Sequence, residues 1–157
     1  MDRQSFKFEY EVYDSSPALN SEDGALFAAA QKATGGAYAP YSGFSVGAAA
    51  RLANGEIITG GNQENASFPA GLCAEGVVMA ASSARFPGVP IEAIAITYRS
   101  ENTPGDGPIS PCGICRQSLQ EYKSRSGRSI RLVMGGQTGK IIAVDDAACL
   151  LPFAFKF

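Results

Sequence analysis

With 157 residues, of which 45% are hydrophobic, the chain has the size and apolar content of a single domain (1–157) with its own core. Its formal net charge of −2 argues against a nucleic-acid partner, because proteins that bind polyanions display a basic stripe. No apolar run approaches the roughly 18 residues of a membrane span, and residues 1–5 lack a secretory-signal pattern. We therefore expect a cytoplasmic protein, with no membrane partner, that acts on a small molecule.

The predicted elements begin with a strand at residues 5–13, where an aromatic or β-branched residue stands at every second position. This segment could extend a sheet or contact another subunit, and residues 1–20 form a possible N-terminal extension. Ser21 is the expected N-cap of a helix that continues through the alanine-rich residues 24–33. Asn54-Gly55 then predicts the turn of a hairpin.

The remaining elements alternate between strands and helices. Strands are predicted at 44–52, 56–59, 91–98, 130–134 and 140–144, and helices at 72–85, at 112–123 and after Asp145-Asp146. This order indicates an α/β fold, a three-layer α/β/α sandwich with helices on both faces of the sheet. Because the first two of these strands form a hairpin, we expect a mixed sheet of about five strands.

The cysteines define the candidate site. The chain contains no histidine, so neither imidazole ligands nor a histidine base are available. Cys73, Cys112 and Cys115 stand at predicted helix N-termini, where the helix dipole favours the thiolate form that binds metal. Three sulfur ligands favour Zn²⁺ and leave a fourth position open for water. Glu75, two residues after the first of these cysteines, is then the natural proton carrier.

Other interpretations of the cysteines remain open on these grounds alone. The three thiols could be buried core residues, or Cys112 and Cys115 could form a redox pair. A structural zinc module would need a fourth protein ligand. Cys149 does not stand at a spacing typical of metal ligands, and we interpret it as a residue of the hydrophobic core. Glu75 could also be an ordinary acidic residue in the first turn of a helix.

Four segments in a fixed order resemble the cytidine deaminase family, specifically its small homotetrameric branch with three cysteine ligands. They are Pro40-Tyr41-Ser42-Gly43-Phe44-Ser45-Val46-Gly47-Ala48-Ala49, Gly61-Asn62-Gln63-Glu64-Asn65-Ala66, Cys73-Ala74-Glu75 and Ser110-Pro111-Cys112-Gly113-Ile114-Cys115-Arg116-Gln117. The resemblance implies one Zn²⁺ per subunit, held by the three cysteines. It also implies that Glu75 deprotonates the zinc-bound water, protonates the pyrimidine ring and then protonates the departing amine.

The same resemblance implies the substrate contacts. Phe44 would form the wall against the base, Asn62 and Glu64 would bind the ribose hydroxyls, and the Ala74 backbone would touch the base edge. The aromatic tail resembles the family segment whose ring enters a neighbouring active site, and Phe155 matches that ring. The expected protein is a homotetramer that takes a nucleoside substrate.

One position departs from the family pattern. Relatives of this branch usually place an arginine directly after the catalytic glutamate, where it bonds the thiolates, and here that residue is Gly76. We expect Arg116 and the two helix dipoles to supply part of the missing positive charge near the ligands.

We therefore expect a zinc-dependent hydrolase that converts cytidine and 2′-deoxycytidine to the uridines with release of ammonia, in pyrimidine salvage. A related aminohydrolase acting on another cytosine-containing compound, such as blasticidin S, is the alternative, and an RNA- or DNA-editing deaminase fits the acidic charge balance poorly.

Overall fold

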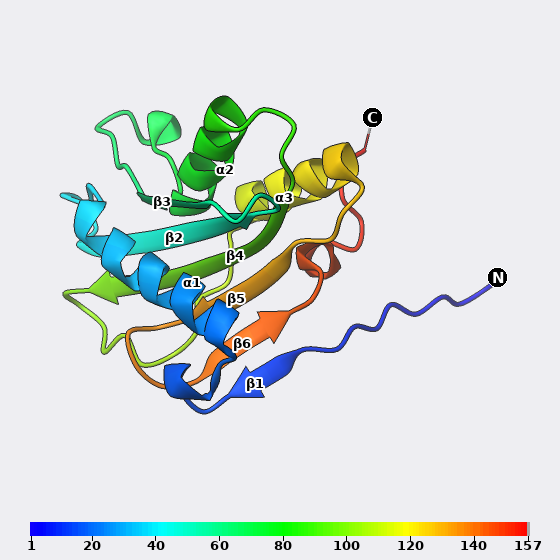
Figure 1. Ribbon diagram of the computed structural model, residues 1–157, viewed down its shortest axis with the longest axis horizontal. Helices are drawn as coiled ribbons and strands as arrows, with labels where there is room; N and C mark the ends of the chain where they lie inside the picture. The colour runs from blue at the N-terminus through cyan, green and yellow to red at the C-terminus, as the bar shows by residue number, and fades with distance from the viewer. Residues whose placement is uncertain (157) are drawn as a thin grey trace.

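The computed structural model describes residues 1–156, which form one mixed sheet with helices on both faces (Figure 1). The strands are β1 (Glu11–Tyr13), β2 (Phe44–Leu52), β3 (Ile57–Gly61), β4 (Ile91–Ser100), β5 (Arg131–Gly135) and β6 (Ile141–Val144). Within these residues the strand order is β1-β6-β5-β4-β2-β3, and β4 and β5 are the one parallel pair. The sheet is mixed, as predicted, and its sixth strand is the short β1.

The helices divide between the two faces of the sheet. They are α1 (Ser21–Ala33), α2 (Ala74–Arg85) and α3 (Gly113–Ser126), together with the short 3-10 helices η1 (Ser16–Ala18), η2 (Thr34–Gly36), η3 (Phe68–Ala70) and η4 (Ala147–Leu150). One core cluster joins α1 to the sheet, and the other joins α2 and α3 to the opposite face. This arrangement confirms the three-layer sandwich, and no helix among residues 1–156 is long and apolar enough to cross a membrane.

The period of two along β4 explains how one strand serves both cores. Ile94 and Ile96 point into the cluster under α2 and α3, whereas Ala93 and Ala95 point towards α1. The small side chains on the α1 face allow that helix to approach the sheet closely. Gly47 on β2 shows how close the approach is, because a Cβ there would lie 2.2 Å from the main-chain oxygen of Ala30.

The N-terminal region differs from the sequence prediction in two details. The strand predicted at 5–13 is confined to Glu11–Tyr13, which pairs with Ile141–Ala143, and β6 ends one residue further on, at Val144. The N-cap of α1 is Asn20 instead of Ser21, and its side-chain oxygen accepts a hydrogen bond from the Asp23 amide at 2.8 Å. Since the cap residue satisfies an otherwise free amide, Asn20 defines where α1 begins.

A partly buried arginine connects the edge strand to the sheet. Arg131 on β5 forms ion pairs with Glu11 of β1, Asp23 of α1 and Asp145 after β6. The Arg131 guanidinium thus connects β5 to β1, to α1 and to the residue after β6. The ion pair with Glu11 helps to hold β1 at the edge of the sheet.

Candidate metal centre and active site

The N-termini of α2 and α3 carry the three predicted cysteine ligands. Cys73 is the N-cap residue of α2 and Cys112 that of α3, and neither side chain makes a capping hydrogen bond. Cys115 lies in the first turn of α3 and is buried. Both thiols at the caps therefore sit where free backbone amides and the positive end of the helix dipole stabilise negative charge.

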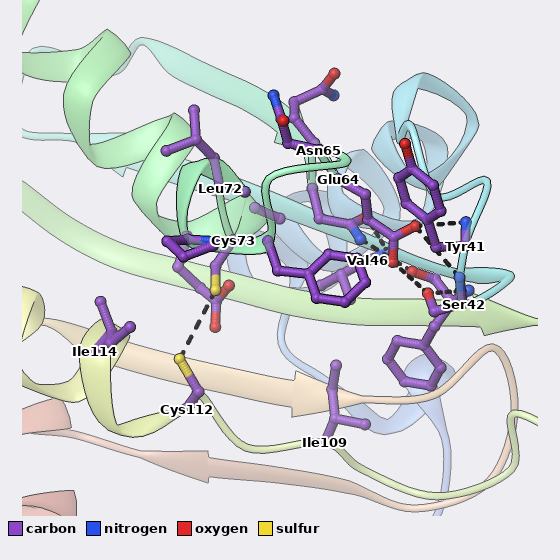
Figure 2. Close-up of a pocket in the computed structure, with 18 of the residues that line it drawn as sticks. Tyr41, Ser42, Val46, Glu64, Asn65, Leu72, Cys73, Ile109, Cys112 and Ile114 are labelled. Atoms are coloured by element: carbon purple, nitrogen blue, oxygen red, sulfur yellow. Dashed lines mark hydrogen bonds between the residues drawn. The ribbon is translucent and has the colours of Figure 1, made fainter.

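The three sulfur atoms converge on one point. All three Sγ atoms lie within 4.8 Å of one another, and those of Cys73 and Cys112 are 3.7 Å apart (Figure 2). Tetrahedral Zn–S bonds of about 2.3 Å place two sulfur ligands about 3.8 Å apart. The donor set and its spacing therefore fit a zinc ion, and Cys149 lies outside this group within residues 1–156.

The thiols strongly affect one another's ionisation. A hydrogen bond from Cys115 lowers the pKa of Cys73 to about 6, and the same interaction together with burial raises the pKa of Cys115. Three thiolates this close repel one another unless a cation neutralises them, which is the condition that a bound metal meets.

Glu75 is buried beside this cluster. Its side chain is 5% exposed in the first turn of α2, and burial raises the pKa of the carboxyl group above its usual range. A carboxyl group with a raised pKa can hold a proton closer to neutral pH than an exposed glutamate can. The position and the pKa of Glu75 suit a residue that alternately accepts and donates a proton.

A cavity of about 960 Å³ opens in front of the cysteines and Glu75. Its wall includes seven of the predicted site residues: Phe44, Asn62, Glu64, Cys73, Ala74, Glu75 and Cys112. Sequence segments separated by up to 68 positions therefore meet at one cavity, whose volume suits a ligand of the size of a nucleoside.

Asn62 is held by the first residues of β2, and Glu64 by the loop that precedes β2. The amide group of Asn62 accepts a hydrogen bond from the Val46 N–H at 2.8 Å and donates one to the Phe44 carbonyl at 3.0 Å. The carboxylate of Glu64 accepts hydrogen bonds from the amide of Tyr41 and from the hydroxyl of Ser42, at 2.9 Å and 2.5 Å (Figure 2). These contacts, the Ser42 hydroxyl first, lower the pKa of Glu64, which is therefore ionised at neutral pH.

The Phe44 ring has an aromatic support. It stacks on the ring of Tyr98, with 4.8 Å between the ring centroids and 18° between the ring planes. Tyr98 belongs to β4 and is buried, so the orientation of the cavity wall is set by the sheet behind it. Stacked rings of this kind resist rotation because both faces lose contact area when one ring turns.

Besides Cys115, two predicted residues are absent from the cavity wall. Arg116 donates hydrogen bonds to the carbonyl oxygens of Pro111 and Leu150, at 2.8 Å and 3.2 Å, and these bonds tie the loop before Cys112 to the end of η4. The side chain of Phe155 is 71% exposed, and its backbone is held by Gln117 through two hydrogen bonds, of 2.9 Å and 3.0 Å.

Several residues of the site were missed from the sequence. Ser42 contacts Glu64 across 22 positions and Tyr98 contacts Phe44 across 54 positions, and the cavity wall also includes Phe68, Leu72, Ile109 and Ile114. Ser42 and Ile114 lie within quoted motifs, which was the only available signal. Tyr98 belongs to β4 and Phe68 to η3, and the neighbours of these two residues, like those of Leu72 and Ile109, depend on the complete fold.

Known proteins resemble the chain over most of its length. The family model described as the cytidine and deoxycytidylate deaminase zinc-binding region matches residues 20–127. A cytidine deaminase of Halalkalibacterium halodurans is 37% identical over 132 residues, which cover 83% of this chain and 91% of that protein. A cytidine deaminase of Sporosarcina psychrophila is 41% identical over 132 residues, covering 83% and 89%.

A solved structure agrees with these sequence matches. The crystal structure of cytidine deaminase from Burkholderia pseudomallei superposes with a TM-score of 0.72 at 35% identity, covering 87% of this chain and all of that chain. The fold and the matches define an enzyme with the α/β architecture of these deaminases. The chain belongs to the cytidine deaminase family.

Proposed function

We propose that this enzyme hydrolyses cytidine and 2′-deoxycytidine to uridine and 2′-deoxyuridine with release of ammonia, and that it serves pyrimidine salvage in the cytoplasm. The observation that carries the proposal is the buried Glu75 beside three converging cysteine thiols at a cavity large enough to admit a nucleoside. Family membership supports the same reaction, since the relatives described above are cytidine deaminases.

Cys73, Cys112 and Cys115 would hold one Zn²⁺ per subunit. Zinc in such a site supplies a Lewis acid that makes a coordinated water acidic near neutral pH. Glu75 takes one proton from the attacking water and delivers it to nitrogen 3 of the base, while the oxygen forms a bond to carbon 4. Glu75 then carries the second proton of that water to the amino group, the bond between carbon 4 and nitrogen 4 breaks, and ammonia leaves.

The remaining residues of the cavity would hold the nucleoside. Phe44 packs against the base in an orientation set by Tyr98, and the Ala74 backbone bonds the base edge. Asn62 and Glu64 bind the ribose hydroxyls. Because the lowered pKa of Glu64 keeps a negative charge at the sugar end, a phosphate there would be repelled, which favours nucleosides over nucleotides.

We propose further that the enzyme is a homotetramer in which Phe155 completes the cavity of a neighbouring subunit. The support is that this ring is largely exposed and absent from the wall of its own cavity. Mixed tetramers test this proposal. Glu75→Ala and Phe155→Ala variants should each be weakly active alone. When the two are denatured together and refolded, activity should return, because some cavities then combine an intact Glu75 with an intact Phe155 from the neighbouring subunit. If the mixture is no more active than its components, Phe155 does not act across subunits.

The reaction itself is tested by Glu75→Gln, which preserves the size of the side chain and removes its proton transfer. The variant should fold, bind zinc and lose cytidine hydrolysis by roughly 10²–10⁴-fold. Glu121→Gln makes the same change at an exposed site on α3 and should keep full activity. Full activity of Glu75→Gln would remove this residue from the mechanism.

A substrate panel separates the proposed function from its alternative. Ammonia release is measured with cytidine, deoxycytidine, deoxycytidine monophosphate and blasticidin S at equal concentrations. We expect turnover of the two nucleosides, and turnover of blasticidin S alone would establish the related aminohydrolase instead.

A further inference from the structure

Residues 1–10, here called the N-terminal arm, continue the direction of β1 but leave the sheet. Strand pairing with β6 is confined to Glu11–Tyr13, and within the described chain residues 1–10 belong to no helix or strand. Figure 1 shows the arm running away from the sheet as a single extended segment. Three aromatic side chains on it are exposed, Phe6 at 53%, Phe8 at 42% and Tyr10 at 58%.

The three rings form a row on one side of the arm. Their successive centroids are 6.1 Å and 6.3 Å apart, which is the spacing of alternate side chains along an extended strand. Val12 continues the row and lies directly opposite Ile142, which packs into the core beneath α2 and α3. The opposite side of the arm carries Lys7 and Glu9, so the segment has the alternating pattern of a strand with one buried face.

The sequence of the arm is complementary to itself in one antiparallel register. With Phe8 opposite the same residue of a second copy, Phe6 faces Tyr10 and Lys7 faces Glu9 in both directions. If the two-fold axis passes through Lys7 or Glu9 instead, two like charges lie directly opposite each other. In registers that are shifted by one residue, an aromatic ring lies opposite a charged side chain. Opposite-charge and aromatic pairs stabilise neighbouring strands, whereas directly opposed like charges destabilise them.

One ring of the arm lies against its own chain. Phe6 lines a cavity of about 440 Å³ whose other walls include Lys123, Asp146 and Pro152. Phe6, Phe8 and Tyr10 nevertheless stay between 42% and 58% exposed, so this contact leaves much of the row of rings uncovered. The outer edge of β1, by contrast, is free to accept another strand, because β1 ends the sheet in the described part of the chain.

We propose that the N-terminal arm pairs antiparallel with the arm of a second copy of this chain, with Phe8 on the two-fold axis. The pairing joins the sheets of two subunits and covers the row of rings. It is an isologous contact, since the same surface is used by both copies.

A cysteine placed on the axis tests this register. Two directly opposed residues have Cα atoms about 4.5–5.5 Å apart, within the range that a disulfide spans. Phe8→Cys should therefore yield a covalent dimer on mild oxidation, seen on a denaturing gel without reductant. Ser5→Cys is the matched control, because in this register it is offset by six positions, about 20 Å, from its counterpart. The unmodified protein controls for its own cysteines.

Charge exchange provides an independent test in the Phe8→Cys background. Lys7→Glu alone sets the introduced carboxylate against the partner's Glu9, and Glu9→Lys alone sets the introduced amine against the partner's Lys7. Each should lower the yield of cross-linked dimer at least threefold. Mixing the two variants, with a purification tag on one, should restore the yield as a mixed dimer, which no contact within one chain can do.

The outcomes decide the proposal without reference to catalysis. Cross-linking of Phe8→Cys that exceeds that of Ser5→Cys, with recovery in the mixture, supports the paired arms. Equal cross-linking of the two cysteine variants, or a mixture that cross-links no better than its components, overturns it and leaves the arm on its own subunit.

Discussion

The Sγ atoms of Cys73 and Cys112 lie 3.7 Å apart, although 39 positions separate the two residues in the chain. Each is the N-cap of its helix, so the two helices begin at the same point on one face of the sheet. The meeting of two positive helix ends favours negative charge on the thiols that are gathered there.

The open space beside Gly76 allows a direct test of the charge missing from this site. A Cβ at Gly76 would meet no atom within 4 Å, so a side chain can leave the backbone there without a clash at its first carbon. Gly76→Arg should shift the acidic limb of the pH–rate profile to lower pH, because a cation near the thiolates makes the attacking water more acidic. Gly76→Gln supplies similar length without the charge. Superimposable profiles for all three proteins would show that this position does not set the acidity.

Tyr98 should contribute to substrate binding through the ring of Phe44. Tyr98→Phe keeps the stacked ring and should leave kcat/KM within about twofold of the original. Tyr98→Leu keeps apolar volume but removes the flat support, and we expect a three- to tenfold loss in kcat/KM, mostly through KM. Steady-state kinetics with cytidine measure both, and thermal unfolding checks that the variants are folded. Equal kinetics of the two variants would refute a role for the stacking.

Ser42 should act through the carboxylate of Glu64. Ser42→Ala removes a hydrogen bond of 2.5 Å from a charged acceptor, which frees Glu64 to rotate and raises its pKa. We expect KM for cytidine to rise roughly fivefold while kcat stays nearly constant. Ser67→Ala, in an exposed loop near the cavity, is the control. A fall in kcat with no change in KM would instead point to a contact with the reacting atoms.

Glu11 should make the attachment of β1 dependent on pH. The hydrogen bond from Arg131 lowers the pKa of Glu11 in the folded protein, so its stabilising contribution is present above the unfolded pKa near 4.5 and disappears as the pH falls through the folded value. Glu11→Gln should therefore lower Tm by more at pH 7 than at pH 3. Because Glu11 is half-exposed, the loss should stay below about 1 kcal/mol.

Glu56→Gln, in the exposed hairpin turn, controls for the general effect of removing an acidic residue. Thermal unfolding of the three proteins across this pH range measures the difference. A deficit of Glu11→Gln that is equal at pH 7 and pH 3 would assign the effect to packing instead of charge.

Local patterns predicted the architecture well. The alternation of strands and helices, the hairpin at Asn54-Gly55 and the cysteines at helix N-termini depend on nearby residues, and the structure confirms the layers and the convergence of the three thiols. The limits of β1 depend instead on where β6 ends and on Arg131, which lies 120 positions from Glu11. Such contacts cannot be read from periodicity.

In the site, too, residues within local motifs were predicted and residues that depend on distant contacts were not. Seven residues on the cavity wall were predicted because they lie in recognisable motifs, whereas the residues that support them were not predicted. Tyr98 was predicted only as part of a buried strand, and its stacking on Phe44 follows from the antiparallel register of β2 and β4. Arg116 was expected near the thiolates, and it donates hydrogen bonds to two backbone carbonyl oxygens.

The central claim is that three thiolates hold one zinc ion that the reaction requires. Zinc content and cytidine hydrolysis should be measured on the same samples of the unmodified protein, Cys73→Ser and Cys149→Ser. We predict one zinc per chain and full activity for the unmodified protein and Cys149→Ser, and loss of both zinc and activity for Cys73→Ser. Hydrolysis at the full rate by Cys73→Ser without zinc would contradict the account.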